Sequence, residues 1–172
     1  RQAQVGNRGA AAIAFGRAGD YQDGRTRSLA RWDQVAVRHT ITAGFDYTVA
    51  LAEDGTLLHT RRLQLKEEYQ SDPSRLGTII AVDGLLCLRD DGTVINPWTR
   101  ETALAEEVST WRNIVSISDG MGLKSDGTVV QSSYASRTYV PFTDQAKWRD
   151  LVAIDGNCGL HADGTVLEVG GI

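Results

Sequence analysis

The residues with the clearest potential for chemistry are aspartates that recur at a regular spacing. Four Asp-Gly-Thr triplets begin at residues 54, 91, 126 and 163, so the intervals between them are 37, 35 and 37 residues. Such carboxylates raise the question of calcium binding, but a calcium loop gathers several oxygen ligands within a few residues. Each triplet offers one or two carboxylates, and aspartate followed by glycine is typical of tight turns. We therefore expect structural turns here and no metal site.

Other groups that could support catalysis form no recognisable arrangement. The histidines His39, His59 and His161 lie at different phases of the repeat and lack a paired metal-ligand spacing. The chain contains no nucleophile elbow, no phosphate-binding glycine loop and no Ser/His/Asp set at a known spacing. We expect no cofactor and no catalysis, with a catalytic site assembled across several repeats as the alternative.

The two cysteines, Cys87 and Cys158, lie in matching second strands of two repeats that are not neighbours. Residues two repeats apart would not meet in a ring or in a linear stack. We therefore expect two buried, small apolar side chains rather than a disulfide or a metal pair.

Composition narrows the class of protein. The 172 residues, 41% hydrophobic and 23% charged, are typical of one globular domain. A net charge of -4 does not favour nucleic-acid phosphates or anionic membranes, and no apolar run approaches the roughly 20 residues that span a bilayer. We expect neither a nucleic-acid nor a membrane partner. Because the sequence begins with Arg1, a processed product or an excised fragment is one interpretation, and the compartment stays open.

The triplets belong to a longer repeat that must position any functional group. Residues 111–130 and 148–167 each contain a tryptophan, a short apolar run, an Asp-Gly pair, a second apolar run and an Asp-Gly-Thr triplet. Weaker copies occupy residues 32–58 and 78–95. Asp-Gly between alternating apolar runs is typical of hairpins with type I′ turns. Each repeat is therefore predicted to form an antiparallel meander of at least three strands.

Repetition of small antiparallel sheets at this period predicts an all-β fold, namely a β-propeller or propeller segment of about four meander blades of 35–40 residues. A stacked β-solenoid is the alternative. The predicted single domain, 1–172, divides into a leading strand and loop at 1–31 and blades at 32–74, 75–110, 111–147 and 148–172. The segment Ala11–Gly16 is expected to be a strand that completes the fourth blade.

The repeat resembles a known family. Trp111–Val130 and Trp148–Val166 combine a tryptophan, an Ile/Val-rich run, a glycine and a segment close to Gly-Leu-Lys-Ser-Asp-Gly-Thr-Val. This pattern is similar to the repeats of the regulator of chromosome condensation family, and Ala14–Leu51 with its FGRAGDYQ lead-in is similar too. The resemblance implies a propeller fold but no single activity, because members include a nucleotide exchange factor, ligase-associated modules and many bacterial proteins of unassigned role.

Two departures from the family pattern matter. The family usually closes a ring of about seven blades, whereas this chain holds four repeats and one leading strand. The family's first hairpin loop is long, and Gly44–Leu51 keeps that length, whereas Gly84–Leu88, Gly120–Leu123 and Gly156–Leu160 are short. We therefore do not expect the loops of an exchange factor, and we expect function in segments that break the repeat.

Aromatic residues in the connections are the candidates for partner binding. Trp32, Trp111 and Trp148 recur in phase and are expected to pack between blades. The out-of-phase aromatic residues, which either bind a partner or pack at blade edges, are Tyr69, Trp98, Tyr134, Tyr139 and Phe142. Loops on rigid scaffolds commonly carry binding, and aromatic anchors dominate many interfaces.

The segment Arg61–Leu76 interrupts the repeat and is expected to be an exposed loop with a helical turn. The sequence as a whole predicts a non-catalytic protein-interaction scaffold of the regulator of chromosome condensation type, with a protein partner. The alternatives are an enzyme or carbohydrate-binding propeller with a site at the ring axis, and a self-assembling segment of a larger propeller that is completed by another copy or segment.

Overall fold

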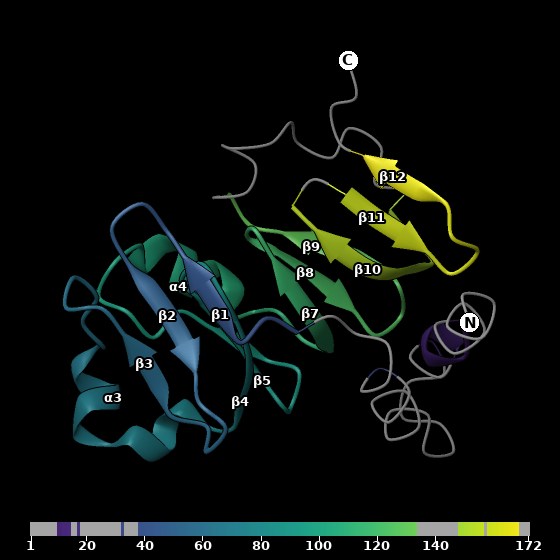
Figure 1. Ribbon diagram of the computed structural model, residues 1–172. Coiled ribbons are helices and arrows are strands. Elements are labelled where there is room, and N and C mark those ends of the chain that lie inside the picture. Colours follow the sequence, from purple (N-terminus) through teal and green to yellow (C-terminus); the bar gives the residue numbers. More distant parts are fainter. Residues whose placement is uncertain are drawn as a thin grey trace.

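The protein is mostly β-sheet. The computed structural model describes residues 10–14, 17, 32, 38–133, 148–156 and 158–168, and the structural statements below concern these residues. They form four antiparallel, three-stranded sheets, each built from strands that are consecutive in the chain (Figure 1). The predicted all-β class and the three-stranded meanders are confirmed.

Each predicted blade range contains one of these sheets. The strands are β1 (Ile41–Ala43), β2 (Thr48–Leu51) and β3 (Leu57–His59); β4 (Ile79–Asp83), β5 (Leu86–Arg89) and β6 (Val94–Ile95); β7 (Ile114–Ser118), β8 (Met121–Lys124) and β9 (Val129–Gln131); β10 (Leu151–Asp155), β11 (Cys158–His161) and β12 (Val166–Glu168). The three later sheets share a register shift in the first strand, at 79–81, 114–116 and 151–153.

Short helices occupy the connections. The helix α3 (Glu67–Ser71) is followed by a 3-10 helix, η2 (Pro73–Leu76), in which the Asp72 side chain accepts a hydrogen bond from Ser74 N at 3.2 Å. The helix α4 (Thr102–Val108) buries Leu104 and Val108, one turn apart, against the second sheet. None of the helices in the described ranges is long and apolar enough to cross a membrane.

The Asp-Gly-Thr hairpins use a different turn from the one predicted. Gly127 N donates to Lys124 O at 2.9 Å, and Lys124 N donates to Thr128 O at 2.8 Å. Gly127 has a φ of +82° whereas Asp126 has no positive φ. This is a three-residue loop with glycine in the left-handed region, so the prediction of type I′ turns is wrong at these triplets. The same hydrogen bonds recur at the other three triplets.

A type I′ turn does occur between the first two strands of the third sheet. Asp119 and Gly120 connect β7 to β8 and have φ values of +46° and +77°. Positive φ at both central positions is what this turn requires, and Asp-Gly meets that requirement. The Asp-Gly prediction is therefore confirmed at this hairpin.

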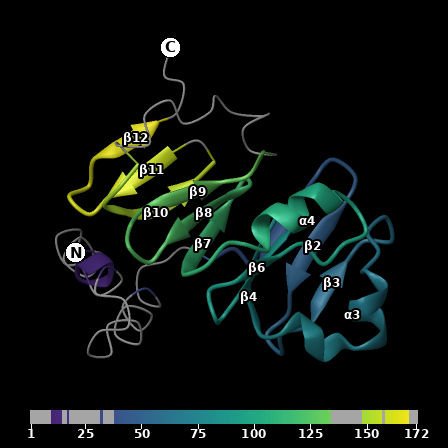
Figure 2. The same cartoon turned by 180° about the vertical axis from the view of Figure 1, so that it is seen from behind.

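The core is divided into three clusters, each between two consecutive sheets. One joins Val49 of the first sheet to Val82 of the second, and another joins Leu88 of the second to Ile117 of the third. The last joins Leu123 of the third sheet to residues of β10. The sheets therefore pack in chain order, with the first and last at opposite ends of the row (Figures 1 and 2).

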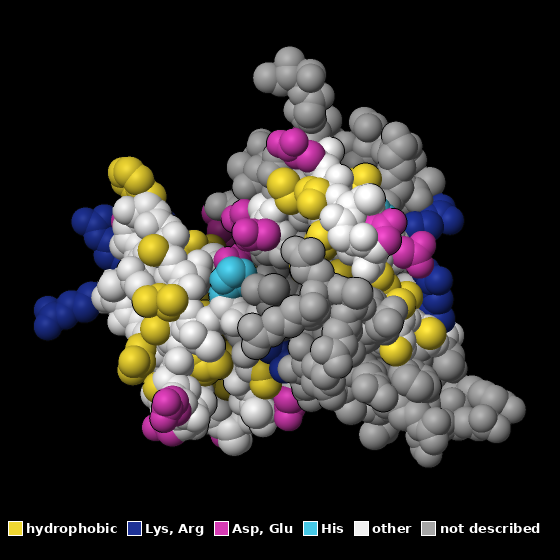
Figure 3. Space-filling view, turned by 45° about the vertical axis from the view of Figure 1, so that its right-hand side comes forward, with side chains coloured by type: hydrophobic (Ala, Val, Ile, Leu, Met, Phe, Trp, Pro, Cys, Tyr) yellow, Lys and Arg dark blue, Asp and Glu magenta, His cyan; other side chains and the backbone are white. Residues whose placement is uncertain are grey.

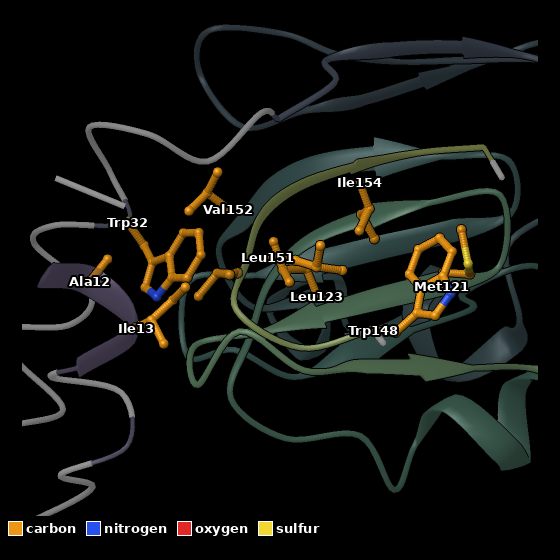
Figure 4. Close-up of a cluster of buried hydrophobic side chains, with 10 residues drawn as sticks. Ala12, Ile13, Trp32, Met121, Leu123, Trp148, Leu151, Val152 and Ile154 are labelled. Atoms are coloured by element: carbon orange, nitrogen blue, oxygen red, sulfur yellow. The ribbon is translucent and has the colours of Figure 1, made fainter. Parts of the chain in front are cut away.

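The in-phase tryptophans are buried in these clusters, as predicted. Trp111 lies in the cluster between the second and third sheets, whereas Trp32 and Trp148 lie in the cluster that joins the third and fourth. Figure 4 shows Trp148 beside Met121, and Trp32 beside Ile13. Trp32 Nε1 also donates to Ser125 O at 3.0 Å.

The N-terminal prediction is wrong where the structure describes it. Residues 10–14, predicted in part as a strand, are helical, and Ala12 and Ile13 are buried against the cluster of the third and fourth sheets. The physical reason is composition, since this stretch is alanine apart from Ile13, and alanine has the highest helix propensity. These residues do not add a strand to the fourth sheet.

The segment Arg61–Leu76 is only in part an exposed loop. The predicted helical turn is present as α3 and η2, neither of which buries a residue. Leu63, however, is buried in the cluster between the first and second sheets, and Leu65 forms a β-bridge with Trp98. The part before Lys66 is therefore packed structure rather than a free loop.

Candidate functional site

The β1–β2 loop, residues 44–47, carries the most exposed large hydrophobic side chain among the described residues. Phe45 has an exposed fraction of 107%, whereas the next most exposed, Ile41 and Val166, reach 65%. Exposure of a whole phenyl ring is unfavourable by roughly 1.5–3 kcal/mol relative to burial. A side chain placed this way is available to a partner that can cover it.

The base of the loop is tightly built. Gly44 N donates to Tyr47 O at 2.9 Å, which closes the hairpin around Phe45 and Asp46. The Tyr47 ring lies over Gly44 so closely that a Cβ at residue 44 would be 2.2 Å from Tyr47 Cε1. Tyr47 also packs against the core cluster of the first two sheets. A side chain at position 44 would therefore displace the Tyr47 ring.

Two arginines from other segments form ion pairs with Asp46. Asp46 Oδ1 accepts a hydrogen bond from Arg100 NH1 at 3.0 Å, and Asp46 Oδ2 lies 3.6 Å from Arg62 NH1. The Arg100 guanidinium also lies 5.9 Å from the centroid of the Tyr47 ring, within reach of a cation–π interaction. The hydrogen bond from Arg100 lowers the pKa of Asp46, and the same contact raises the pKa of Arg100.

We call Phe45, Asp46, Tyr47, Arg62 and Arg100 the loop site. Two arginines against one aspartate give it a net positive charge of one, and it also carries the exposed Phe45 ring. Aromatic and arginine residues are enriched where protein interfaces carry most of their binding energy. The loop site therefore combines one exposed apolar ring with the charged side chains of Asp46, Arg62 and Arg100.

The sequence candidate Trp98 is completely buried, with an exposed fraction of 0%. Its ring packs edge-on against His59 with centroids 5.1 Å apart, inside the cluster of the first two sheets. Trp98 therefore offers no surface to a partner, and the packing alternative is the correct one for this residue. The inserted segment contributes to this cluster, because Leu63 lies in it and Leu65 forms a β-bridge with Trp98.

Tyr69 is half-buried at the edge of a shallow depression of about 260 Å³ between α3 and α4. Burial raises the pKa of its phenol. Lys66 crosses the depression and donates to Asn96 O at 3.0 Å. The volume falls below the roughly 300–1,000 Å³ typical of ligand pockets. The remaining candidates, Tyr134, Tyr139 and Phe142, lie outside the described residues.

The triplet aspartates have a structural role. Asp126 Oδ1 accepts from Thr128 N at 2.9 Å and from Thr128 Oγ1 at 2.6 Å, and Asp91 and Asp163 bind their threonines in the same way. These bonds lower the pKa of Asp163. Within the described ranges, His, Cys, Asp and Glu form no group of three or more that could hold a metal ion.

Hydrogen bonds link the first hairpins of neighbouring sheets. Gly84 N donates to Thr42 Oγ1 at 3.0 Å, Asp119 N donates to an Asp83 oxygen, and Gly156 N donates to Ser118 Oγ at 3.0 Å. Burial raises the pKa of Asp83 despite the bond from Asp119. The chain of contacts connects all four sheets, so these groups serve packing between sheets.

Cys87 is buried as predicted, and burial raises the pKa of its thiol to about 12. Cys158 is only half-buried, and neither cysteine forms a disulfide. Cys87 therefore remains a neutral thiol and acts as a small apolar residue.

Phe45 was not among the residues singled out from the sequence. The signal that could have found it was the length of Gly44–Leu51, the one first hairpin to keep a long connection. No family model, curated protein or solved structure matches the chain.

Proposed function

We propose that this chain is a non-catalytic, protein-binding scaffold of the regulator of chromosome condensation type, in which the four sheets are blades of a propeller segment. Support for the blade arrangement comes from the packing of three-stranded meanders in chain order and from the hydrogen bonds that link their first hairpins. Blades of a propeller bury their faces against their neighbours in this way.

The observation that carries the binding role is Phe45. Its ring is fully exposed although the loop beneath it is held by Asp46, Tyr47 and Arg100. A fixed loop loses little conformational freedom on binding, so an exposed aromatic side chain on it can act as an anchor. We propose a protein partner with an apolar pocket for Phe45 and acidic groups near Arg62 and Arg100.

The test compares proteins captured from an extract of the source organism by the wild type, Phe45→Ala and Glu53→Ala. The last variant shortens an exposed side chain after β2, at the opposite end of that strand from the β1–β2 loop. We expect a partner that the wild type and Glu53→Ala retain and that Phe45→Ala loses. With the purified partner, loss of an anchor worth about 2 kcal/mol or more weakens binding by roughly 30-fold or more in Kd.

The proposal is wrong if Phe45→Ala captures the same proteins with unchanged affinity. A control for folding is the urea midpoint, which the Phe45→Ala change should leave unaltered because the ring makes no buried contact.

A further inference from the structure

Each sheet has two faces, which point in opposite directions along the row of sheets. We call the face that contacts the next sheet the forward face, and the face that contacts the preceding sheet the back face. One cross-strand pair marks each forward face, three residues before and three residues after the triplet aspartate. These pairs are Leu51 with Leu57, Leu88 with Val94, Leu123 with Val129, and Leu160 with Val166.

The forward pair is covered in the first three sheets and uncovered in the last. Leu88 and Leu123 are completely buried in the clusters shared with the following sheet, and Leu51 packs against such a cluster too. In the last sheet Leu160 is 36% exposed and Val166 is 65% exposed. Among the described residues, the last sheet thus keeps the apolar pair but leaves it partly exposed.

The back face is covered in the three later sheets and exposed in the first sheet, at the other end of the row. Its marker pairs lie four residues before and four after the aspartate: Ala50 with Leu58, Cys87 with Ile95, Gly122 with Val130, and Gly159 with Leu167. In the three later sheets these pairs pack against the cluster shared with the preceding sheet. In the first sheet Leu58 is 54% exposed, and Ile41, which pairs with Ala50, is 65% exposed.

The two uncovered faces are therefore the two halves of an interface that the chain already makes three times internally. End repeats of solenoid-like proteins normally carry a polar outer face for solubility. The first sheet has no such cap, because β1, β2 and β3 contain no Asp, Glu, Lys or Arg. Figure 3 shows hydrophobic side chains in yellow on the surface of this sheet, at the left.

We propose that a second copy of this chain docks head to tail, with the back face of β1–β3 in one copy packed on the forward face of β10–β12 in the other. Each chain carries both halves, so any two copies present complementary faces. Such a contact is heterologous, and it closes into a ring if the rotation allows and otherwise continues as an open chain. This docking does not depend on the partner proposed for Phe45.

The test measures mass in solution by sedimentation velocity across protein concentration. We expect the 18.7 kDa chain to form a species of twice that mass, or a longer series, as concentration rises to about 100 µM. Leu58→Glu and Val166→Glu each place a charge on one exposed end face, so each alone is expected to be monomeric. The matched control, Ala103→Glu on the exposed side of α4, should associate like the wild type.

Mixing distinguishes head-to-tail docking from symmetric pairing. Leu58→Glu retains an intact forward face and Val166→Glu an intact back face, so an equimolar mixture should form a heterodimer that neither variant forms alone. A wild type that stays monomeric at every concentration overturns the proposal. So does a Val166→Glu variant that associates on its own, because that result means back face on back face. Circular dichroism confirms that each variant is folded.

Discussion

The contact between Trp111 and Gly122 allows a prediction about how the third sheet accommodates its tryptophan. An ideal Cβ at residue 122 would lie 3.0 Å from two ring atoms of Trp111 and 3.1 Å from Ile114 Cδ1. Gly122 lies in β8 without a positive φ, so its backbone accepts a side chain and only the contact opposes one. Gly159 stands in the same relation to Trp148, at 3.1 Å.

The expected cost of Gly122→Ala follows from two opposing effects. Overpacking of a buried site costs roughly 1–3 kcal/mol, because the indole and Ile114 must both move. Replacing glycine by alanine in a compatible conformation restores about 0.4–1 kcal/mol by restricting the unfolded chain. We therefore expect a net loss of up to about 2.6 kcal/mol in the free energy of unfolding, with a midpoint of about 1.3 kcal/mol.

A double-mutant cycle with Trp111→Leu isolates the contact. The second sheet shows the alternative arrangement, because Leu76 and Cys87 occupy the positions of Trp111 and Gly122 relative to the triplet. Leucine at 111 should make room for the added methyl group, so the double variant should be more stable than the sum of the single losses predicts, by about 0.5 kcal/mol or more. Urea unfolding followed by far-UV circular dichroism measures all four proteins. Additive losses, or a Gly122→Ala variant more stable than the wild type, would refute the reasoning.

Three further predictions concern stability. Trp148→Ala should lose roughly 3–5 kcal/mol on urea unfolding because its ring is buried between sheets, and a loss below about 1 kcal/mol would contradict that placement. Asp126→Ala should lose about 1 kcal/mol by the same measurement, because Thr128 loses its acceptor; an unchanged midpoint would count against this role. Burial holds the pKa of Asp83 above its ordinary value of 3.8, so the folded state binds more protons and stability falls as pH rises from about 4 through the raised pKa. Asp83→Asn keeps an acceptor for Asp119 N, so it should be more stable than the wild type at pH 7 and equal to it near pH 3; urea midpoints that differ equally at both pH values would contradict this.

The hairpins were predictable because their determinants are local. An aspartate, a glycine and a threonine within three residues specify the loop, since the carboxylate binds the threonine and the glycine takes the positive φ. The period then locates every sheet. The turn type was wrong at the triplets because Asp-Gly suits both a type I′ turn and a type I turn followed by a left-handed glycine, and strand register decides between them.

The predictions from sequence fail in segments whose structure depends on contacts with distant residues, or whose helix propensity opposes the predicted strand. Residues 11–16 align with the last strand of the fourth repeat, which predicted a strand. The alanines at 11, 12 and 14 favour a helix instead, and a helix also allows Ile13 to be buried against the third and fourth sheets. Leu63 lies in a charged stretch that resembles an exposed loop, but it is buried through contacts with residues of the first two sheets, which are distant in sequence. The sequence does not identify Phe45 as a site residue, because a single phenylalanine next to a glycine does not indicate whether its side chain is exposed.

The position of Trp98 follows from a gap in the repeat. The third and fourth repeats begin with Trp111 and Trp148, which enter the cores with the preceding sheets. The second repeat has Leu76 at that position, so the cluster between the first and second sheets receives no in-phase tryptophan. Trp98 enters this cluster from the connection after β6, and every cluster therefore contains an indole. Trp98 is out of phase in the sequence, but in the structure it fills a core position that the other clusters fill with in-phase tryptophans. Phe45 is also outside the repeat pattern, but its side chain is exposed. The loop site is therefore the better candidate for partner binding.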